Sequence, residues 1–234
     1  MVWATQHLGR KMATYTPATL SEMGRLGSPA ARLRRARLGL ICGIATVCMV
    51  FISLTSAYIV RQGLPTFDGS SNSYVRDWGR VDLPWMLLAI NTAVLLMSSV
   101  TIELARRQVA RQAALAMSSG AGTSAGNERS FPWLGITVLL GFGFLAGQWL
   151  AWGELHARGF FVNTNPDSSF VFLLTIAHAV HLAGGMIALL WAASASLLHK
   201  AAAERRIGVD ITAWYWHFMA VLWIYVFALL GLAR

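Results

Sequence analysis

The chain has 234 residues, of which 56% are hydrophobic and 12% are charged, and its formal net charge is +9. A soluble domain carries about 25% charged residues, so this composition excludes an ordinary soluble domain and indicates an integral membrane protein. The basic residues lie beside apolar stretches, which is typical of membrane proteins and argues against nucleic-acid binding. Cys42 and Cys48 lie on different faces of one apolar stretch, and no disulfide is expected between them.

Five stretches are long and apolar enough to cross a bilayer as helices, which takes about 20 residues each. They predict an all-α bundle of five transmembrane helices, at about 38–60, 84–105, 131–153, 169–198 and 211–232. We expect a basic N-terminal segment at 1–37 and one transmembrane domain at 38–234. Polar or low-complexity loops are expected between the spans, notably at 63–83, 108–130 and 199–210.

Lysine and arginine are distributed unevenly between the two sides of this predicted bundle. Fourteen lie on the side of the N-terminus and five on the other side. By the positive-inside rule the N-terminus is cytoplasmic and, after five spans, the C-terminus is outside. No secretory or organelle targeting signal is visible, so we expect a multi-pass protein of the bacterial inner membrane. Arg34 and Arg35 before the first span, and Tyr58 and Arg61 at its far end, are expected lipid or interface anchors.

The fourth span places two histidines, His178 and His181, in the middle of the membrane. Their i,i+3 spacing puts both imidazoles on nearly the same helix face, and ionisable groups at this depth face protein and not lipid. One interpretation is that they hydrogen-bond across helices and hold the bundle together. The other is that one of them ligates a haem b together with His217 of the fifth span. No cysteine or carboxylate cluster in the spans completes a metal site, and none supplies a proton relay.

The five spans show no internal repeat, which argues against a transporter built from paired halves. Trp214, Trp216 and Trp223 of the fifth span are interpreted as packing and interface residues. The residues alone therefore predict a subunit that packs on a catalytic partner. No catalytic, cofactor-binding or metal-binding residue is expected in the chain itself.

Short motifs follow one another along the five spans and together resemble subunit III of the haem-copper oxidases, the cytochrome c and quinol oxidases. The resemblance covers about 38–232. The motifs are Ser56 to Arg61, Leu83-Pro84-Trp85, Asn91-Thr92, Ser98-Ser99, Gln148 with Trp152 and Leu155, Phe170, Leu174-Thr175, His178, His181, Gly184-Gly185, Tyr215-Trp216-His217-Phe218 and Trp223.

This resemblance implies a subunit without haem or copper, which are expected in partner subunits. It implies packing on subunit I, with subunit II and other respiratory subunits as further partners, and support of proton uptake, assembly and turnover in aerobic electron transport. It also implies bound phospholipid, which the family often holds in a cleft between two helices and the remaining five; this chain resembles the five-helix form that lacks those two. The expected anchors between helices are His178, His181 and His217, with Gln148, Asn91 and Trp216 in similar roles. A quinol oxidase subunit, or the related subunit of a nitric oxide reductase, is the alternative.

Three positions depart from the family by lacking a carboxylate. A buried glutamate of the family falls at Thr46 or Val47, a second falls at Ala151, and an aspartate falls at Ala220. These departures suggest that this version is structural. Our hypothesis is that any collection of protons falls to surface groups such as Glu103, Glu128 and Glu204.

Overall fold

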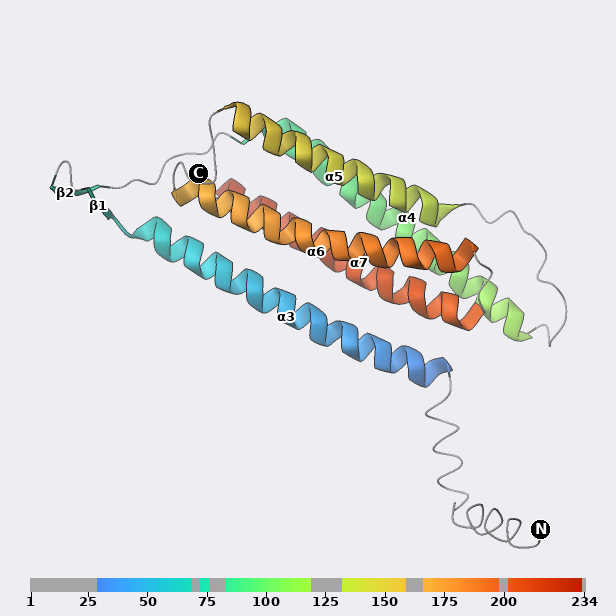
Figure 1. The fold of residues 1–234 in the computed structure, drawn as a ribbon. Coiled ribbons are helices and arrows are strands. Elements are labelled where there is room, and N and C mark those ends of the chain that lie inside the picture. Colours follow the sequence, from blue (N-terminus) through green and yellow to red (C-terminus); the bar gives the residue numbers. More distant parts are fainter. Residues whose placement is uncertain are drawn as a thin grey trace, which may run out of the picture. The chain divides into compact units, whose positions relative to one another are not determined.

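A computed structural model describes residues 29–68, 72–75, 83–118, 132–158, 166–197 and 202–232. They form the helices α3 (Pro29–Gly63), α4 (Trp85–Ser118), α5 (Trp133–Ala157), α6 (Pro166–Leu197) and α7 (Ala202–Leu232), with short strands β1 (Thr66–Asp68) and β2 (Ser73–Val75) (Figure 1). Each of these five helices contains a stretch long and apolar enough to cross a membrane. The expectation of an all-α protein with five such helices is confirmed, while the side on which each terminus lies stays a prediction.

Two of the predicted loops are partly helical, so those predictions are wrong in part. Helix α4 continues through residues 108–118, and α7 begins at Ala202, inside the predicted loop 199–210. Residues 108–118 contain four alanines, and residues 202–210 contain two alanines and two arginines. Both residue types have high intrinsic helix propensities. A composition of low complexity therefore did not exclude helix. Both helices extend beyond the roughly 20 residues that a bilayer requires.

The predicted loop 63–83 contains the two short strands. They pair antiparallel, with Thr66 opposite Val75, and Asn72 adopts a positive φ of 46° before β2. Asparagine tolerates this left-handed conformation better than most residues. Residues 1–28 of the predicted N-terminal segment, and Glu128 of the second predicted loop, lie outside the described residues.

The chain forms two compact units, Met1–Cys42 and Gly43–Arg234, and the division falls within α3. In the first unit the described residues are the start of α3, where Arg34 and Arg35 are exposed. In the second unit four helices form a closed arrangement. Helix α4 packs on α5 and α7, and α6 packs on the same two helices (Figure 1).

Within the second unit, α3 meets the other helices through side chains along a single stripe. The Phe51 ring stands edge-on to the His181 ring of α6, with centroids 5.9 Å apart. One turn later the Tyr225 hydroxyl of α7 donates a hydrogen bond to Thr55 Oγ1 at 2.8 Å, and Tyr58 packs edge-on against a phenylalanine of α6. The contacting positions follow an i,i+4,i+7 spacing, which places them on one face of the helix.

Large apolar side chains fill the centre of the second unit. Phe144, Leu182, Trp216, Met219 and Trp223 are each exposed by 1% or less. The outward-facing positions are apolar as well; Met86 of α4, Leu139 and Trp149 of α5 are exposed by 80%, 72% and 73%. Exposed apolar surface on this scale is unusual for a soluble monomer, and it is the surface that lipid or a partner's helices would cover.

A close approach between α5 and its neighbours depends on Gly141. A Cβ atom at this position would lie 2.6 Å from Met186 Sδ and 3.0 Å from Trp216 Cη2. Small residues at helix contacts are typical of membrane bundles, because they let backbones approach closely. This glycine therefore fixes how near α5 comes to α6 and α7.

Candidate functional site

His178 lies at the centre of the bundle and is 1% exposed. Its ring stands edge-on to Phe144 of α5, with centroids 6.2 Å apart, and lies tilted against Trp223 of α7 at 5.0 Å. Neither ring nitrogen has a hydrogen-bond partner among the described residues. His178 thus joins α5, α6 and α7 through ring contacts, and its role as a hydrogen-bonding anchor stays a prediction.

His181, one turn further along α6, is half-buried and faces α3 and α7. Its Nδ1 lies 2.7 Å from the carbonyl oxygen of Ala177 in the same helix. The backbone carbonyl of His181 accepts a hydrogen bond from the Tyr215 hydroxyl of α7 at 3.0 Å. Together with the ring contact to Phe51, these interactions place His181 where three helices meet.

His217 belongs to a charged cluster between α4 and α7. Its Nε2 lies 3.6 Å from Glu103 Oε2. Glu103 also accepts hydrogen bonds from Arg106 and from Arg107, each at 2.8 Å, and Arg106 reaches Asp210 of α7 at 3.3 Å. Arg106 therefore bridges a carboxylate on each helix. Of the proposed proton-collecting groups, Glu103 is thus engaged in ion pairs, while Glu204 lies in α7.

A stripe of small polar residues runs along α4 and is bonded to both neighbouring helices. Ser98 Oγ accepts a hydrogen bond from the indole N–H of Trp216 in α7 at 2.8 Å, and both residues are fully buried. The side-chain amide of Asn91 donates to Gln148 of α5, a long bond of 3.5 Å. In a membrane, where no water competes, such bonds hold helices in register. The structure therefore brings Asn91, Gln148 and Trp216 into contacts between helices.

Two further bonds of this stripe did not stand out in the sequence. The hydroxyls of Thr101 in α4 and Thr137 in α5 lie 2.9 Å apart, and the Trp223 indole N–H donates to Thr92 Oγ1 at 2.9 Å. The sequence signal for these bonds was the regular spacing of the small polar residues on α4, at intervals of about seven and three residues. The helix that each of them faces cannot be read from that spacing.

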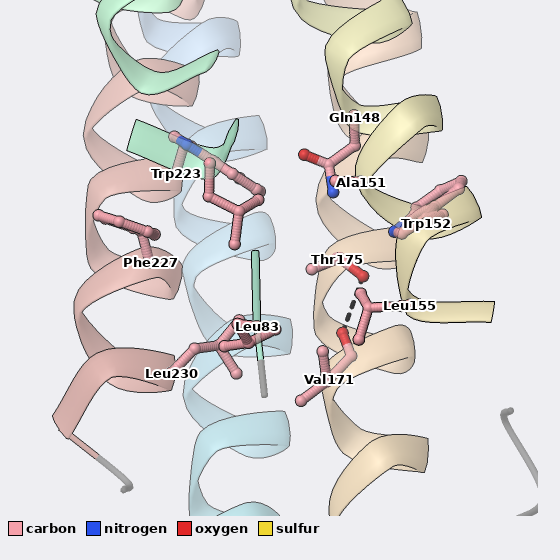
Figure 2. A pocket seen from close by; sticks show the side chains of 11 residues that line it. Leu83, Gln148, Ala151, Trp152, Leu155, Val171, Thr175, Trp223, Phe227 and Leu230 are labelled. Carbon is pink, nitrogen blue, oxygen red and sulfur yellow. Dashed lines mark hydrogen bonds between the residues drawn. The ribbon is translucent and has the colours of Figure 1, made fainter. Parts of the chain in front are cut away.

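A small pocket lies beside this stripe, between the start of α4 and α6 and the ends of α5 and α7. Figure 2 shows Gln148, Trp152 and Thr175 on one side of it and Trp223 and Phe227 on the other. Its volume of about 10 Å³ is on the scale of a single water molecule. Its other lining residues are apolar: Leu83, Leu88, Ala151, Leu155, Val171 and Leu230.

Three of the four positions considered as departures from the family hold buried apolar side chains, whereas Thr46, the alternative to Val47, is exposed. Val47, Ala151 and Ala220 are exposed by 9%, 1% and 4%.

Of the expected anchors at the membrane surface, Tyr58 is buried at 4% exposure, and Arg61 donates a hydrogen bond to the carbonyl oxygen of Leu64 at 3.1 Å. Tyr58 is therefore placed to pack inside the protein.

Within the described ranges, no group of three or more histidine, cysteine, aspartate or glutamate side chains lies close enough together to hold a metal ion. The three histidines considered for haem ligation have different surroundings. His178 contacts aromatic rings, His181 contacts Phe51 and the carbonyl oxygen of Ala177, and His217 contacts Glu103. What this arrangement of side chains can do is join helices to one another.

Comparison with known proteins places the chain among respiratory oxidase subunits. Residues 20–231 match the family model of cytochrome c oxidase subunit III. Cytochrome c oxidase subunit 3 of Synechocystis is 27% identical, over 94% of this chain and 82% of the relative. Cytochrome bo(3) ubiquinol oxidase subunit 3 of Pseudomonas aeruginosa is 28% identical, over 81% and 80%. Cytochrome c oxidase subunit 3 of Triticum aestivum is 26% identical, over 82% and 66%.

The family match spans nearly the whole length of the chain and agrees with its five long apolar helices and with the order of its motifs. The chain belongs to the cytochrome c oxidase subunit III family, and it is subunit III of a cytochrome c oxidase or of a bo(3)-type quinol oxidase.

Proposed function

We propose that this chain is a structural, non-redox subunit that packs on subunit I of the oxidase and supports its assembly, proton uptake and stability during turnover. The observation that carries the proposal is that the buried polar side chains bond one helix to another. Ser98, Thr101 and Asn91 of α4 bond to side chains of α5 and α7 and do not converge on a common cavity. Such an arrangement builds a rigid bundle whose apolar outer surface is available to a partner.

The proposed orientation in the membrane has the N-terminus in the cytoplasm and the C-terminus outside. It is supported by the fourteen lysines and arginines on the side of the N-terminus against five on the other. We place the protein in a bacterial inner membrane. The cluster around Glu103 and Asp210 then faces the cytoplasm, from which the oxidase takes up protons.

For the electron donor we propose cytochrome c, with a quinol as the alternative. Support for cytochrome c comes from the family and from the Synechocystis relative, which covers the largest share of this chain among the three relatives named above. The donor is bound by another subunit, so the partners of this chain decide the question. The proposed partners are subunit I, subunit II and membrane lipid.

The test is a pull-down of the chain in mild detergent, followed by mass spectrometry and a reduced-minus-oxidised spectrum. We expect a large multi-helix haem protein together with a copper-binding subunit. Recovery of a partner without that copper-binding subunit would identify a quinol oxidase. Recovery of the chain alone with a haem of its own would overturn the structural role and support a haem-b electron carrier that uses His178 or His181 with His217.

A further inference from the structure

Trp152 of α5 carries a buried indole N–H and lies in the wall of the small pocket (Figure 2). Its Nε1 atom has no hydrogen-bond partner among the described residues. Two other indoles of the bundle donate to hydroxyl groups, Trp216 to Ser98 and Trp223 to Thr92. A buried donor without an acceptor loses the hydrogen bond that water gives it in the unfolded chain. The indole of Trp152 therefore needs an acceptor that the described side chains do not supply.

Two more polar side chains belong to the wall of this pocket, Gln148 and Thr175, each 4% exposed. Gln148 precedes Trp152 by one helical turn, so the two share a face of α5. Its amide oxygen accepts the long bond from Asn91, which leaves the amide NH2 group as a donor. Thr175 Oγ1 of α6 donates to the carbonyl oxygen of Val171 at 2.8 Å and keeps lone pairs as an acceptor.

The directions of these groups agree with a shared ligand. In Figure 2 the amide nitrogen of Gln148 and the indole nitrogen of Trp152 both point into the pocket, and the hydroxyl of Thr175 lies below them. The pocket thus offers two donors from α5 and one acceptor from α6. The remaining wall is apolar, so the polar groups gather on one side.

The size and charge of the pocket match a single water molecule. Its volume of about 10 Å³ is close to the least that a water needs, and a buried water typically makes about three hydrogen bonds. None of the lining residues carries a charge, which disfavours an ion. A ligand of this size that accepts two hydrogen bonds and donates another is water.

The pocket lies close enough to the ends of the helices for water to reach it. Leu155 in its wall is two residues before the end of α5 at Ala157, and Leu230 is two residues before the end of α7 at Leu232. Trp152 is five residues from the end of α5, about 7.5 Å along the helix. Entry therefore requires no path through the centre of the bundle.

We propose that this pocket binds one water molecule, which accepts hydrogen bonds from Trp152 Nε1 and Gln148 Nε2 and donates one to Thr175 Oγ1. The water links α5 to α6, which also meet through aromatic contacts such as Phe144 with His178. In lipid such a link is not weakened by competing solvent. The proposal concerns the bundle itself and holds for either electron donor.

The direct test is electron cryomicroscopy of the intact oxidase that contains the full chain, at a resolution that shows ordered water elsewhere in the complex. We expect a compact density peak about 3 Å from Trp152 Nε1 and within the same reach of Gln148 and Thr175. No peak there, while other buried waters are visible, would overturn the proposal. So would an elongated density, which would assign the pocket to a lipid or detergent tail.

A second test uses the unfolding equilibrium of the full chain in mixed micelles, with two variants of Ala151, which lines the pocket. Ala151→Ser supplies a hydroxyl in place of the water and should stay within about threefold of the unaltered chain. Ala151→Cys has a similar helix propensity but displaces the water without replacing its bonds. It should raise the unfolding equilibrium constant roughly tenfold.

The variant Trp152→Phe separates this effect from steric strain, because it removes the indole N–H. In that background Ala151→Cys should cost less than about threefold, since no indole donor is left without an acceptor. An equal cost in both backgrounds would indicate overpacking and refute the water. In a dry pocket Ala151→Cys would cost nothing and Ala151→Ser would stabilise the chain, and either result also refutes it. If these variants do not fold, the density of the unaltered complex decides the question.

Discussion

The replacement Gly141→Ala tests whether the contact of α5 with α6 and α7 is as close as the structure indicates. The added methyl group would lie 2.6 Å from Met186 Sδ and 3.0 Å from Trp216 Cη2. The methionine side chain is flexible and can move. Trp216 cannot move easily, because it is 0% exposed and its indole N–H is bonded to Ser98 at 2.8 Å. Overpacking of this kind costs about 1–3 kcal/mol.

The assay is the free energy of unfolding of the chain in mixed micelles, measured by titration with sodium dodecyl sulfate. Gly153→Ala is the matched control, because it lies in the same helix and a Cβ atom there meets nothing within 4 Å. It should be neutral or stabilising by up to about 1 kcal/mol, since alanine is the better helix former. We expect Gly141→Ala to be less stable than this control by about 1–3 kcal/mol.

A double-mutant cycle sharpens the test by removing the atom that the methyl group would strike. Trp216→Phe shortens the ring so that it no longer reaches the position of Cη2. The cost of Gly141→Ala should then fall by about half or more in the Trp216→Phe background, since contacting residues are energetically coupled. Equal costs in both backgrounds, or equal stabilities of Gly141→Ala and Gly153→Ala, would refute the reasoning.

Three further predictions concern the polar contacts. Ser98→Ala should lower the free energy of unfolding by about 1–2 kcal/mol, because it leaves a buried indole N–H without an acceptor, while Ser99→Ala, whose hydroxyl has no described partner, should be neutral. Arg106→Gln should cost about 1 kcal/mol, because it removes the bridge between carboxylates on α4 and α7, whereas the more exposed Arg107→Gln should cost under about 0.5 kcal/mol; equal effects, or no decline of the difference at high salt, would contradict the bridge. His181→Ala should reduce assembly of the bundle and leave the haem absorbance per chain unchanged, and loss of a haem band would show that this histidine is a ligand.

The hydrophobic pattern alone was sufficient to predict five membrane-spanning helices. An unpaired backbone group is costly in lipid, so a single span must be a helix, and it needs about 20 apolar residues to cross the hydrocarbon core. Such a stretch is easily recognised in a sequence. The helix ends were not predicted in the same way. Outside the bilayer that constraint lapses, and the continuation of α4 to Ser118 depends on helix propensity and on contacts such as Arg205 with Gln112.

The candidate site could be predicted only in part. His178 was singled out because an imidazole in an apolar span is unusual, and it lies in the core as expected. Its surroundings were not predictable, because Phe144 and Trp223 come from helices 34 and 45 residues away in sequence. The bond between Trp216 and Ser98 was not predictable for the same reason, because the two residues are 118 positions apart in sequence.

The sequence by itself determined that the chain crosses a membrane five times, that its buried histidines face protein, and that it resembles an oxidase subunit. These conclusions rest on the composition of the chain, on the helical period of its apolar and polar residues and on the order of its motifs, which can all be read along the sequence. Only the tertiary structure decided which polar groups meet and that Glu103 and Asp210 are bridged by Arg106. Helical period fixes the face on which a side chain lies, but the neighbouring helix that meets this face depends on the packing of the whole bundle.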